Sequence, residues 1–468
     1  MTAVGGRWRV VALAVFVAMA VAGCDWTAYL GGPEHHSQAP DAGITRPTVA
    51  TLKRKWRWHP QTYSNRPGSM FSTPVTWRGT IFVGTNSGFL VALDAVTGAQ
   101  KWQRDFGFQP KFACNAAGID SSPAVRDDGN GNPLVYLNAP DGYLYELDGL
   151  TGNVVWKSVV QIPSTTVNDS YAWSSPTLAN GRVYVGIASG CDSPFVRGAL
   201  KAYDQQTGAL LATGWTMPSG YVGAGIWTSA AADANGVYVT TGSTTTATQT
   251  AHPPTVTNAF DQYSILKLDP TTLAVVGKWP APPTNVGDPD FGSSPILFTA
   301  TVGGVGLQMA GACNKDGNFY AVRTDTMQLV WSRQVGTGAD AGQVACLSGG
   351  VWDGSHLFVA GNATTVGGTA VAGSVRQLDP ATGSIVWETG LPANPLGTGS
   401  ANAAGLLAYA GTDWNDGPGN GVYVLDATTG QVVRTLDDVA EYPEFAQVVW
   451  SDGRLYATNT DSVVMWSP

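Results

Sequence analysis

Short runs of alternating apolar and polar residues follow one another along most of the chain, and this two-residue period is typical of β-strands that bury one face. Tight turn sequences separate the runs, most often Asp-x-x-Thr-Gly. One combination of run, turn and run recurs at residues 90–98, 144–152, 200–208, 375–383 and 422–430, with weaker copies at 266–279 and 319–331. This self-similarity indicates an architecture built from one repeated supersecondary unit.

Each copy predicts a strand, a tight turn and a second strand. In the turn, Asp and Thr can bond backbone N–H groups and Gly can take a positive φ. The second strand often carries a tryptophan that we expect to pack between neighbouring sheets; these residues are Trp102, Trp156, Trp331 and Trp387. Two further apolar runs precede most copies, the first of them beside a Ser-Pro or Thr-Pro pair. Four antiparallel strands per repeat predict a blade of a β-propeller.

The number of blades follows from the repeats. Seven copies are present between residues 90 and 430. The tail adds apolar runs at 455–457 and 463–466, which lack an outer strand, while the segment 49–58 is a strand-like run without a blade. Joining them gives an eighth blade closed by both chain ends, which hides the free edges of the ring. We therefore predict an all-β, eight-bladed propeller over residues 46–468, with seven blades as the alternative.

Composition and charge narrow the possible functions. The chain has 17 Trp and 10% aromatic residues, enough apolar area to fill a sizeable core. Its net charge is −9, and no block of basic residues offers a face to phosphates, so nucleic acid is not an expected partner. The sequence contains no Gly-x-Ser-x-Gly motif, and its glycine pairs do not precede a helix. These observations exclude the serine-hydrolase, Rossmann and P-loop interpretations.

The first 24 residues resemble a bacterial lipoprotein signal. Arg7 and Arg9 precede an apolar run at 10–20, and a small-residue cleavage site ends at Cys24. The resemblance implies that residues 1–23 are removed and that Cys24 carries the lipid. The mature chain would then be held on an extracytoplasmic face of the cell envelope by the lipid anchor alone; an ordinary secretory signal peptide is the alternative.

We expect the lead segment, residues 24–45, to be flexible and its adjacent histidines, His35 and His36, to be solvated.

Four cysteines remain, and none forms a Cys-x-x-Cys pair, which excludes the common zinc, iron–sulfur and c-type haem motifs. An even number in a compartment that permits disulfides favours two bridges. Three pairings are possible. Closeness in sequence favours Cys114 with Cys191 and Cys313 with Cys346, and the other two pairings stay open.

The repeat Ala-x-Asp-x-x-Thr-Gly-x-x-x-Trp resembles the tryptophan-docking repeat of the pyrroloquinoline quinone (PQQ) propellers. This family contains quinoprotein alcohol dehydrogenases and non-catalytic BamB-type lipoproteins. The resemblance covers nearly all of the mature chain, and residues 25–32 are similar to the start of the dehydrogenase branch. It implies a quinone near the axis of the ring, stacked on a tryptophan beside Ca²⁺ and a catalytic aspartate.

The resemblance also implies roles for individual residues. The motif Gly-Ala-Gly-Ile-Trp ends in Trp227, which would stack on PQQ. The Asp-Pro-Asp-Phe-Gly and Cys-Asn-Lys-Asp-Gly motifs imply Asp290 as the base and Lys315 as the cation at the quinone carbonyls. Asp192 would be an acidic metal ligand, joined by Asp290 and Ser243. These residue types suit alcohol oxidation, because a carboxylate can accept the hydroxyl proton and an ammonium can stabilise charge on the reduced quinone.

Three positions depart from the family pattern. Phe71 and its neighbours replace a glutamate that contacts the quinone, Ser243 replaces an asparagine ligand, and Cys114 is followed by Asn115 instead of a second cysteine. Each site motif also has a plain structural interpretation: the acidic and Lys-Asp-Gly segments as turns, and Trp227 as one more packing tryptophan.

Two function hypotheses follow. The first is a PQQ-dependent dehydrogenase that oxidises a small alcohol or polyol and, lacking a haem motif, needs a separate electron acceptor. The second is a non-catalytic scaffold lipoprotein whose propeller binds other envelope proteins, which the missing glutamate and asparagine favour. An insertion at 244–258 is a candidate substrate lid.

Overall fold

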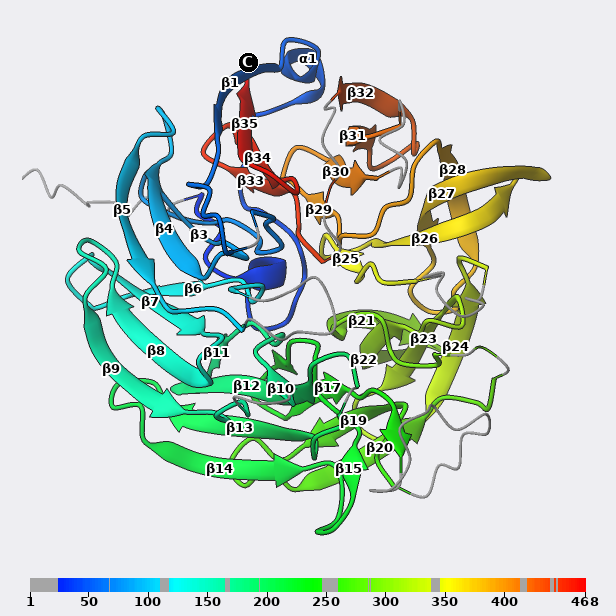
Figure 1. The fold of residues 1–468 in the computed structure, drawn as a ribbon. Coiled ribbons are helices and arrows are strands. Elements are labelled where there is room, and N and C mark those ends of the chain that lie inside the picture. Colours follow the sequence, from blue (N-terminus) through cyan, green and yellow to red (C-terminus); the bar gives the residue numbers. More distant parts are fainter. Residues whose placement is uncertain are drawn as a thin grey trace, which may run out of the picture.

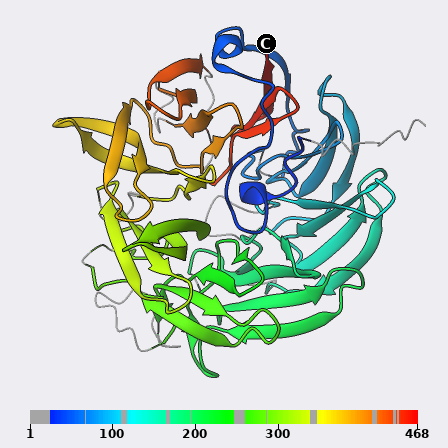
Figure 2. The same cartoon turned by 180° about the vertical axis from the view of Figure 1, so that it is seen from behind.

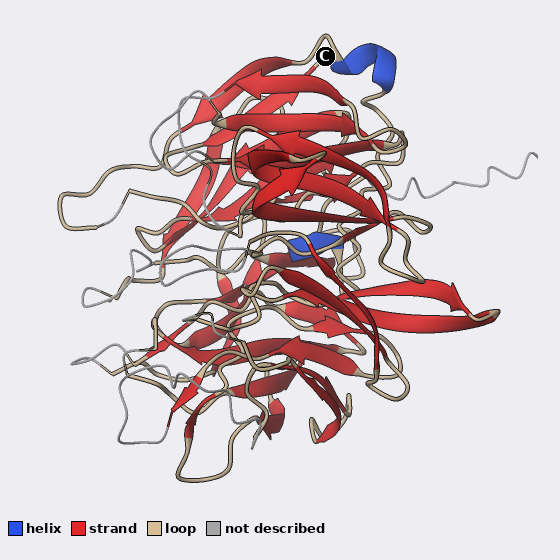
Figure 3. Ribbon diagram, turned by 90° about the vertical axis from the view of Figure 1, so that its right-hand side faces the viewer, coloured by secondary structure: helices blue, strands red, loops and turns tan. Residues whose placement is uncertain are grey.

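Eight antiparallel sheets surround a central axis, so the predicted eight-bladed propeller is confirmed (Figure 1). The computed structural model describes residues 24–66, 68–109, 118–164, 169–192, 194–245, 260–284, 286, 288–337, 346–412, 419–437, 442 and 445–468. In each blade one edge strand lies nearest the axis and the opposite edge strand lies outermost. The side view shows that the described chain consists almost entirely of strands and loops (Figure 3).

The strands of the blades have the following bounds. Blade 1 contains β2 (Val75–Trp77), β3 (Thr80–Gly84), β4 (Phe89–Asp94) and β5 (Gln100–Asp105). Blade 2 contains β6 (Ala124–Asp127), β7 (Pro133–Asn138), β8 (Tyr143–Asp148) and β9 (Val154–Val159). Blade 3 contains β11 (Thr177–Ala179), β12 (Arg182–Ser189), β13 (Ala199–Asp204) and β14 (Leu210–Trp215), with β10 (Ser170–Tyr171) paired to the end of β12. Blade 4 contains β16 (Ala231–Ala232), β17 (Val237–Thr240), β19 (Ser264–Leu268) and β20 (Val275–Pro280).

The remaining blades follow the same order. Blade 5 contains β21 (Ile296–Val302), β22 (Val305–Cys313), β23 (Asn318–Arg323) and β24 (Leu329–Gln334). Blade 6 contains β25 (Val351–Trp352), β26 (Leu357–Val366), β27 (Thr369–Leu378) and β28 (Ile385–Leu391). Blade 7 contains β29 (Ser400–Ala401), β30 (Leu406–Gly411), β31 (Gly421–Asp426) and β32 (Val432–Asp437). Blade 8 contains β33 (Val449–Ser451), β34 (Arg454–Thr458), β35 (Val463–Ser467) and β1 (Lys53–Trp58), and a separate ribbon pairs β15 (Val222–Gly223) with β18 (Thr244–Thr245).

The eighth blade is closed by both chain ends, as predicted. Its outer strand, β1, pairs with β35 near the C-terminus. Trp56 on β1 then packs onto blade 1, where a Cβ at Gly98 would lie 2.7 Å from Trp56 Cδ2. The N-terminal strand therefore completes the last blade and also docks it onto the first, so the ring has no open junction at this position.

The repeat tryptophans pack between neighbouring blades, as expected. A Cβ at Gly152 would lie 2.9 Å from Trp102 Cε3, and Trp102 Nε1 donates a hydrogen bond of 3.0 Å to Gly149 O. The glycines of these turns have φ between 68° and 74°, which an L-residue with a Cβ seldom adopts. The same contact joins Trp156 to Gly208, Trp331 to Gly383 and Trp387 to Gly430.

Two junctions reverse the sizes of the docking residues. Leu273 and Met327 occupy the turn position of blades 4 and 5 with φ of 58° and 54°, where the other turns have glycine. The residues that face them on the preceding blades are glycines. A Cβ at Gly277 would lie 2.5 Å from Met327 Cγ, and a Cβ at Gly214 would lie 2.9 Å from Leu273 Cβ. Trp279, which ends the weaker repeat, is therefore not the docking residue of its blade.

Ser and Thr residues just before the inner strands, most of them in Ser-Pro or Thr-Pro pairs, link the blades around the axis. In each link, a backbone N–H of one blade donates to a Ser or Thr hydroxyl oxygen of the next. Four consecutive links run from Thr73 N to Ser122 Oγ, Ser122 N to Ser175 Oγ, Ser175 N to Ser229 Oγ and Ser229 N to Ser294 Oγ, at 2.8 to 2.9 Å. These residues form a ring of hydroxyl groups close to the axis.

The lead segment is ordered and runs around the inner strands, so its expected flexibility is wrong. Seen from behind, the dark blue lead crosses the centre of the ring (Figure 2). Its carbonyl groups accept hydrogen bonds of 2.7 to 3.0 Å from the second residue of six inner strands. The donors, in blade order 1, 2, 4, 5, 6 and 7, are Thr76, Val125, Ala232, Leu297, Trp352 and Ala401, and the acceptors are Trp26, Thr27, Pro33, Glu34, His36 and Ser37.

These bonds satisfy backbone N–H groups on strand edges that face the axis. His35 is also buried, with 1% of its surface exposed, and its Nδ1 lies 2.8 Å from Pro295 O. The predicted solvation of His35 is therefore wrong. The lead includes the short helix η1 (Tyr29–Gly31), and α1 (Arg46–Val49) follows it. Across the described ranges, neither helix has the length and apolarity needed to cross a bilayer.

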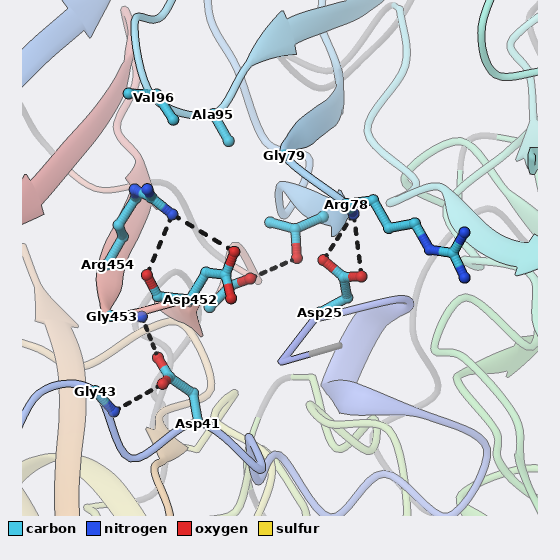
Figure 4. A network of polar contacts seen from close by, with 12 residues as sticks. Asp25, Asp41, Gly43, Arg78, Gly79, Ala95, Val96, Asp452, Gly453 and Arg454 are labelled. Atoms are coloured by element: carbon cyan, nitrogen blue, oxygen red, sulfur yellow. Dashed lines mark hydrogen bonds and ion pairs between the residues drawn. The ribbon is translucent and has the colours of Figure 1, made fainter. Parts of the chain in front are cut away.

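A polar network holds the two ends of the lead against blades 1 and 8 (Figure 4). The Asp25 carboxylate accepts the Arg78 backbone N–H at 2.9 and 3.0 Å. Asp41 accepts the N–H groups of Gly43 and Gly453, each at 2.8 Å. The lead is thus fixed at both ends as well as along its length.

Candidate active site

The five residues that the resemblance assigned to the cofactor site lie in loops of blades 3 to 5. Asp192 follows β12, Trp227 precedes β16 and Ser243 follows β17, whereas Asp290 precedes β21 and Lys315 follows β22. Cys24, the predicted lipidation site, is not part of this group, because it begins the lead segment beside Asp25. The structure therefore brings loops of three successive blades to one region beside the axis.

Lys315 is the cation at the centre of this group of residues, which we call the cluster. Its Nζ lies 2.7 Å from Asp288 Oδ2 and 3.8 Å from Asp290 Oδ2. The same ammonium lies 5.2 Å from the centroid of the Trp227 ring, within range of a cation–π contact. The two nearby carboxylates raise the pKa of Lys315 although burial acts in the opposite direction, so its ammonium stays charged. An indole, an ammonium and carboxylates thus meet at one place.

Asp290 is a buried carboxylate with two different oxygens. Ser243 Oγ donates a hydrogen bond of 2.6 Å to Oδ1, whereas Oδ2 faces Lys315. Burial raises the pKa of Asp290 well above its usual range, and the negative charges of Asp288 and Asp192 act in the same direction. Lys315 and the Ser243 hydrogen bond oppose this rise. Such an environment keeps a carboxyl group ready to exchange a proton.

Close backbone contacts leave room for these side chains. A Cβ at Gly242 would lie 3.0 Å from Asp290 Oδ2, so glycine at this position permits Asp290 to approach. Lys315 N donates to Asp290 O at 2.9 Å, which joins the two loops directly. The Cys313–Cys346 disulfide, with Cα atoms 5.4 Å apart, ties the Lys315 turn to the segment before blade 6. This disulfide confirms one predicted pairing; in the other, Cys191 is disulfide-bonded but Cys114 lies outside the described residues.

The acidic and hydroxyl oxygens are suitable in type for a calcium ion but few in number. Asp192 Oδ1 accepts a hydrogen bond of 2.6 Å from the Ser189 hydroxyl. The negative charge of Asp192 helps to raise the pKa of both Asp290 and Lys315. Over the described part of the chain, no three His, Cys, Asp or Glu side chains are grouped closely enough to hold a metal by themselves. Ca²⁺ takes six to eight oxygens, so the cofactor or water would have to supply the others.

A small cavity adjoins the cluster on the axis. It has a volume of about 40 Å³, and Trp227, Phe71 and Phe445 lie in its wall. Phe445 makes an edge contact with Trp227, with ring centroids 5.4 Å apart and planes at 75°. Phe71, found where the family has a glutamate, is therefore an axial residue. It contributes an apolar side chain to the wall.

Sequence reasoning missed two side chains of this region. Asp288 was interpreted as a turn residue, yet it forms the shortest ion pair of Lys315. Its position two residues before Asp290 was the available signal, since a second carboxylate so close in sequence can compete for the same cation. Phe445 carried no signal, because it belongs to a loop more than 200 positions away from its partner Trp227 in the sequence.

Solved structures share this architecture. Quinohemoprotein alcohol dehydrogenase from Comamonas testosteroni aligns with 95% of this chain and 80% of its own, with a TM-score of 0.71 and 17% identity. BamB from Moraxella catarrhalis aligns with 89% of this chain and 98% of its own, with a TM-score of 0.52 and 14% identity. At such identities the likeness defines the fold, which is that of the quinoprotein dehydrogenase-like propellers.

The family follows from the sequence match. The model of the PQQ-type glucose/ethanol/alcohol dehydrogenase β-propeller domain matches residues 26–326. The chain therefore belongs to this family of PQQ propellers, as its repeat predicted.

Two curated relatives illustrate the relationship. The dehydrogenase subunit of alcohol dehydrogenase (quinone) from Gluconobacter oxydans is 32% identical over 42% of this chain and 25% of its own length. Polyvinylalcohol dehydrogenase from a Pseudomonas species is 26% identical over 79% of this chain and 60% of its own. The chain thus spans between a quarter and three fifths of the length of these relatives.

Proposed function

We propose that this protein is a PQQ-dependent dehydrogenase that oxidises an alcohol. The observation that carries the proposal is the convergence of Trp227, Lys315 and Asp290, with the ammonium 5.2 Å from the indole centroid and 3.8 Å from the carboxylate. A flat quinone needs an aromatic face, and its reduction needs a fixed positive charge beside a carbonyl oxygen. The relatives named as quinone-dependent alcohol dehydrogenases support the same conclusion.

The residues of the site divide the work of the reaction. PQQ, when bound, would accept the two electrons that the alcohol loses. Asp290 accepts the hydroxyl proton at Oδ2, since Ser243 occupies Oδ1. Lys315 supplies the fixed positive charge, and Asp288 holds its ammonium at 2.7 Å. Trp227 gives the ring a surface on which to stack.

Ca²⁺ is the metal that this proposal includes. Asp192, Asp290 and Ser243 would hold it through hard oxygen ligands. Asp288 Oδ1 is a buried oxygen without a hydrogen-bond partner in the described part of the chain, so the cluster offers an acceptor for a metal. A metal held here would bring positive charge to a region with three carboxylates and one ammonium. A separate electron acceptor completes the proposal, because the sequence contains no Cys-x-x-Cys-His motif.

We also propose that Cys24 is lipidated and anchors the protein on an extracytoplasmic membrane face. The support is the signal-like sequence before Cys24, together with the presence of Cys24 as a free, partly buried thiol. Mass spectrometry of the N-terminal peptide from the native host would detect the lipid. An unmodified N-terminus, or one that begins at another residue, would contradict this part of the proposal and leave the site untouched.

The test of function uses the full chain, PQQ and Ca²⁺. We expect the wild type to bind the quinone and to reduce a dye with an alcohol present. Asp290→Asn should retain quinone absorbance but lose about 10²- to 10⁴-fold in rate, the range for a general base. Asp94→Asn, in a surface turn of blade 1, is the matched control and should keep the wild-type rate.

Two outcomes would count against this function. Failure of the wild type to bind PQQ would remove the dehydrogenase proposal and leave the scaffold hypothesis, which recovery of stable envelope partners on the purified protein would then test. Full activity of Asp290→Asn with quinone bound would instead show that another group accepts the proton.

A further inference from the structure

The wall of the axial cavity beside Trp227 includes a buried acid that the proposed reaction does not use. Asp120 lies in the wall of this cavity with Trp173 and Tyr29, next to the ring of hydroxyls formed by Ser122 and the equivalent serines. Every other described wall residue is aromatic, hydroxylic or glycine. The wall therefore includes no described side chain that could neutralise a negative charge on Asp120.

The contacts around Asp120 need one more proton than an ionised carboxylate and a tyrosine hydroxyl together supply. Tyr171 Oη lies 2.8 Å from Asp120 Oδ2 and 2.7 Å from the Gly118 carbonyl oxygen. Both of these oxygens accept, yet a phenol has a single hydrogen to donate. If Asp120 carries a proton, Oδ2–H donates to Tyr171 Oη and the phenol donates to Gly118 O, so both of these contacts are hydrogen bonds. If Asp120 is ionised, the single phenol hydrogen can serve only one of these two acceptors.

The second carboxyl oxygen points to the same state. Asp120 Oδ1 is buried and has no hydrogen-bond partner among the described residues. A buried carboxylate oxygen in this condition carries the full cost of lost solvation, whereas the carbonyl oxygen of a neutral acid carries much less. Two independent features of the geometry, the shared phenol and the lone Oδ1, therefore favour the neutral form.

We propose that Asp120 is a proton-binding site inside the propeller, a neutral carboxylic acid that keeps the axial cavity behind Trp227 free of charge. The cavity is large enough for a few water molecules, since one water needs about 10–15 Å³, and these would exchange the proton. This inference does not depend on the quinone.

The titration of Asp120 is expected near neutral pH. Burial raises the pKa of Asp120 to about 7, and the Tyr171 hydrogen bond opposes the rise. The titratable groups that face Asp120 from the packed elements are Tyr171 of β10 and Tyr29 of η1. Burial raises the pKa of both phenols, to about 12 for Tyr29, so both stay neutral in this range. Of these three groups, Asp120 is therefore the one whose charge changes near neutral pH.

The experiment compares the melting temperatures of the wild type and Asp120→Asn, in which the amide mimics the neutral acid. In the unfolded chain Asp120 ionises near about pH 4. The folded protein keeps a proton that the unfolded chain has lost, so wild-type stability falls as the pH rises from about 4 to about 7. The asparagine variant lacks this fall. Its Tm relative to the wild type should rise by a few degrees between about pH 5 and about pH 8.

A matched control and a second readout make the test specific. Asp316→Asn removes another carboxyl group that accepts a tyrosine hydroxyl, from Tyr320 at 2.6 Å, but the other oxygen of Asp316 has a donor as well, the Asn318 N–H at 2.8 Å. We expect no gain in relative Tm for this control as the pH rises. The infrared difference spectrum of the wild type minus Asp120→Asn should show a protonated carboxyl band that disappears at alkaline pH, since the contribution of Asp290 cancels in this difference.

Asp120→Leu, which is also uncharged, extends the test if the asparagine variant does not fold. A constant Tm difference across the pH range, with no protonated carboxyl band, would overturn the proposal. A wild-type Tm at about pH 8 that is higher in potassium than in choline chloride, with no such effect in Asp120→Asn, would also overturn it, because a bound cation would then neutralise an ionised Asp120.

Discussion

At the scale of the residue, each Asp-x-x-Thr-Gly turn both reverses the chain and joins two blades. In the blade 6 turn, Asp379 Oδ1 accepts the N–H groups of Ala381 and Thr382 at 3.0 and 2.8 Å. Gly383 then takes φ of 68° and leaves space for Trp331 of the preceding blade. The glycine therefore meets two separate requirements, one of the backbone and one of the neighbouring ring.

The two requirements can be measured separately. Gly383→Ala places a Cβ 2.4 Å from Trp331 Cε3 at a positive φ. We expect it to lower the free energy of unfolding by about 2–4 kcal/mol, from backbone strain plus overpacking. Gly405 has φ of 76° with nothing within 4 Å of its Cβ position, so Gly405→Ala should cost only about 1 kcal/mol. Denaturant unfolding of both variants checks this, and equal losses would contradict a role for the tryptophan contact.

Much of the candidate site could be anticipated from single residues. The motifs around Trp227, Asp290 and Lys315 lie within a few positions of recognisable turns, and the structure brings these side chains together. Asp120 could not be anticipated, because its meaning comes from Tyr171, about 50 positions away, and from a cavity wall whose described residues include no cation. Local sequence carries the turn chemistry, but it does not show which blades supply the walls of a cavity.

At the scale of the element, the lead segment shows the limit of periodicity as a guide. Its residues have no strand pattern, so the sequence predicted a flexible tether. The lead is held instead by its own carbonyl groups, which accept N–H groups from the inner strands at 2.7 to 3.0 Å. Any residue can supply a carbonyl group, so this interaction leaves no trace in the pattern of side chains. Its order comes from the strand edges that face the axis.

The lead should respond to acid through His35. Burial lowers the pKa of His35 to about 4, compared with about 6.5 in an unfolded chain. Between these values the unfolded state binds a proton that the folded state does not, so stability falls as the pH drops from about 6.5 to about 4, by about 3 kcal/mol in total. His35→Asn tolerates the local φ of 61° and cannot be charged.

Urea midpoints of the wild type and His35→Asn at about pH 7 and about pH 5 test this expectation. We expect the variant to be less stable at the higher pH, because it loses buried contacts, and the difference to narrow at the lower pH. His356→Asn, at a largely exposed side chain, is the control and should show no such narrowing. A difference that widens on acidification would mean that His35 is charged in the folded protein.

At the scale of the whole molecule, stability depends on closing the ring. Seven blades are each built from one continuous segment, and their order could be predicted from the repeat. The eighth needs β1 from one end of the chain and three strands from the other. This blade could be predicted because the C-terminal runs lacked an outer strand, whereas the strand-like run at 49–58 belonged to no other blade. The size-reversed junctions at Leu273 and Met327 were not foreseen, since the repeat there is degenerate.

Closure makes a definite prediction about the C-terminus. Deleting residues 463–468 removes β35, so β1 and β34 each lose a pairing partner. Val463, Val464, Met465 and Trp466 are at most 3% exposed, and their burial contributes about 6–12 kcal/mol at 1.5–3 kcal/mol each. This equals most of the 5–15 kcal/mol that stabilises a typical native protein. The truncated chain should therefore lack cooperative unfolding by circular dichroism and be digested rapidly by protease.

A cut between Gly367 and Gly368, at the tip of the β26–β27 hairpin, is the control: it leaves all the blades paired and should preserve the ring. Cooperative unfolding of the truncated chain with an unchanged Tm would show that blades 1 to 7 hold together without closure.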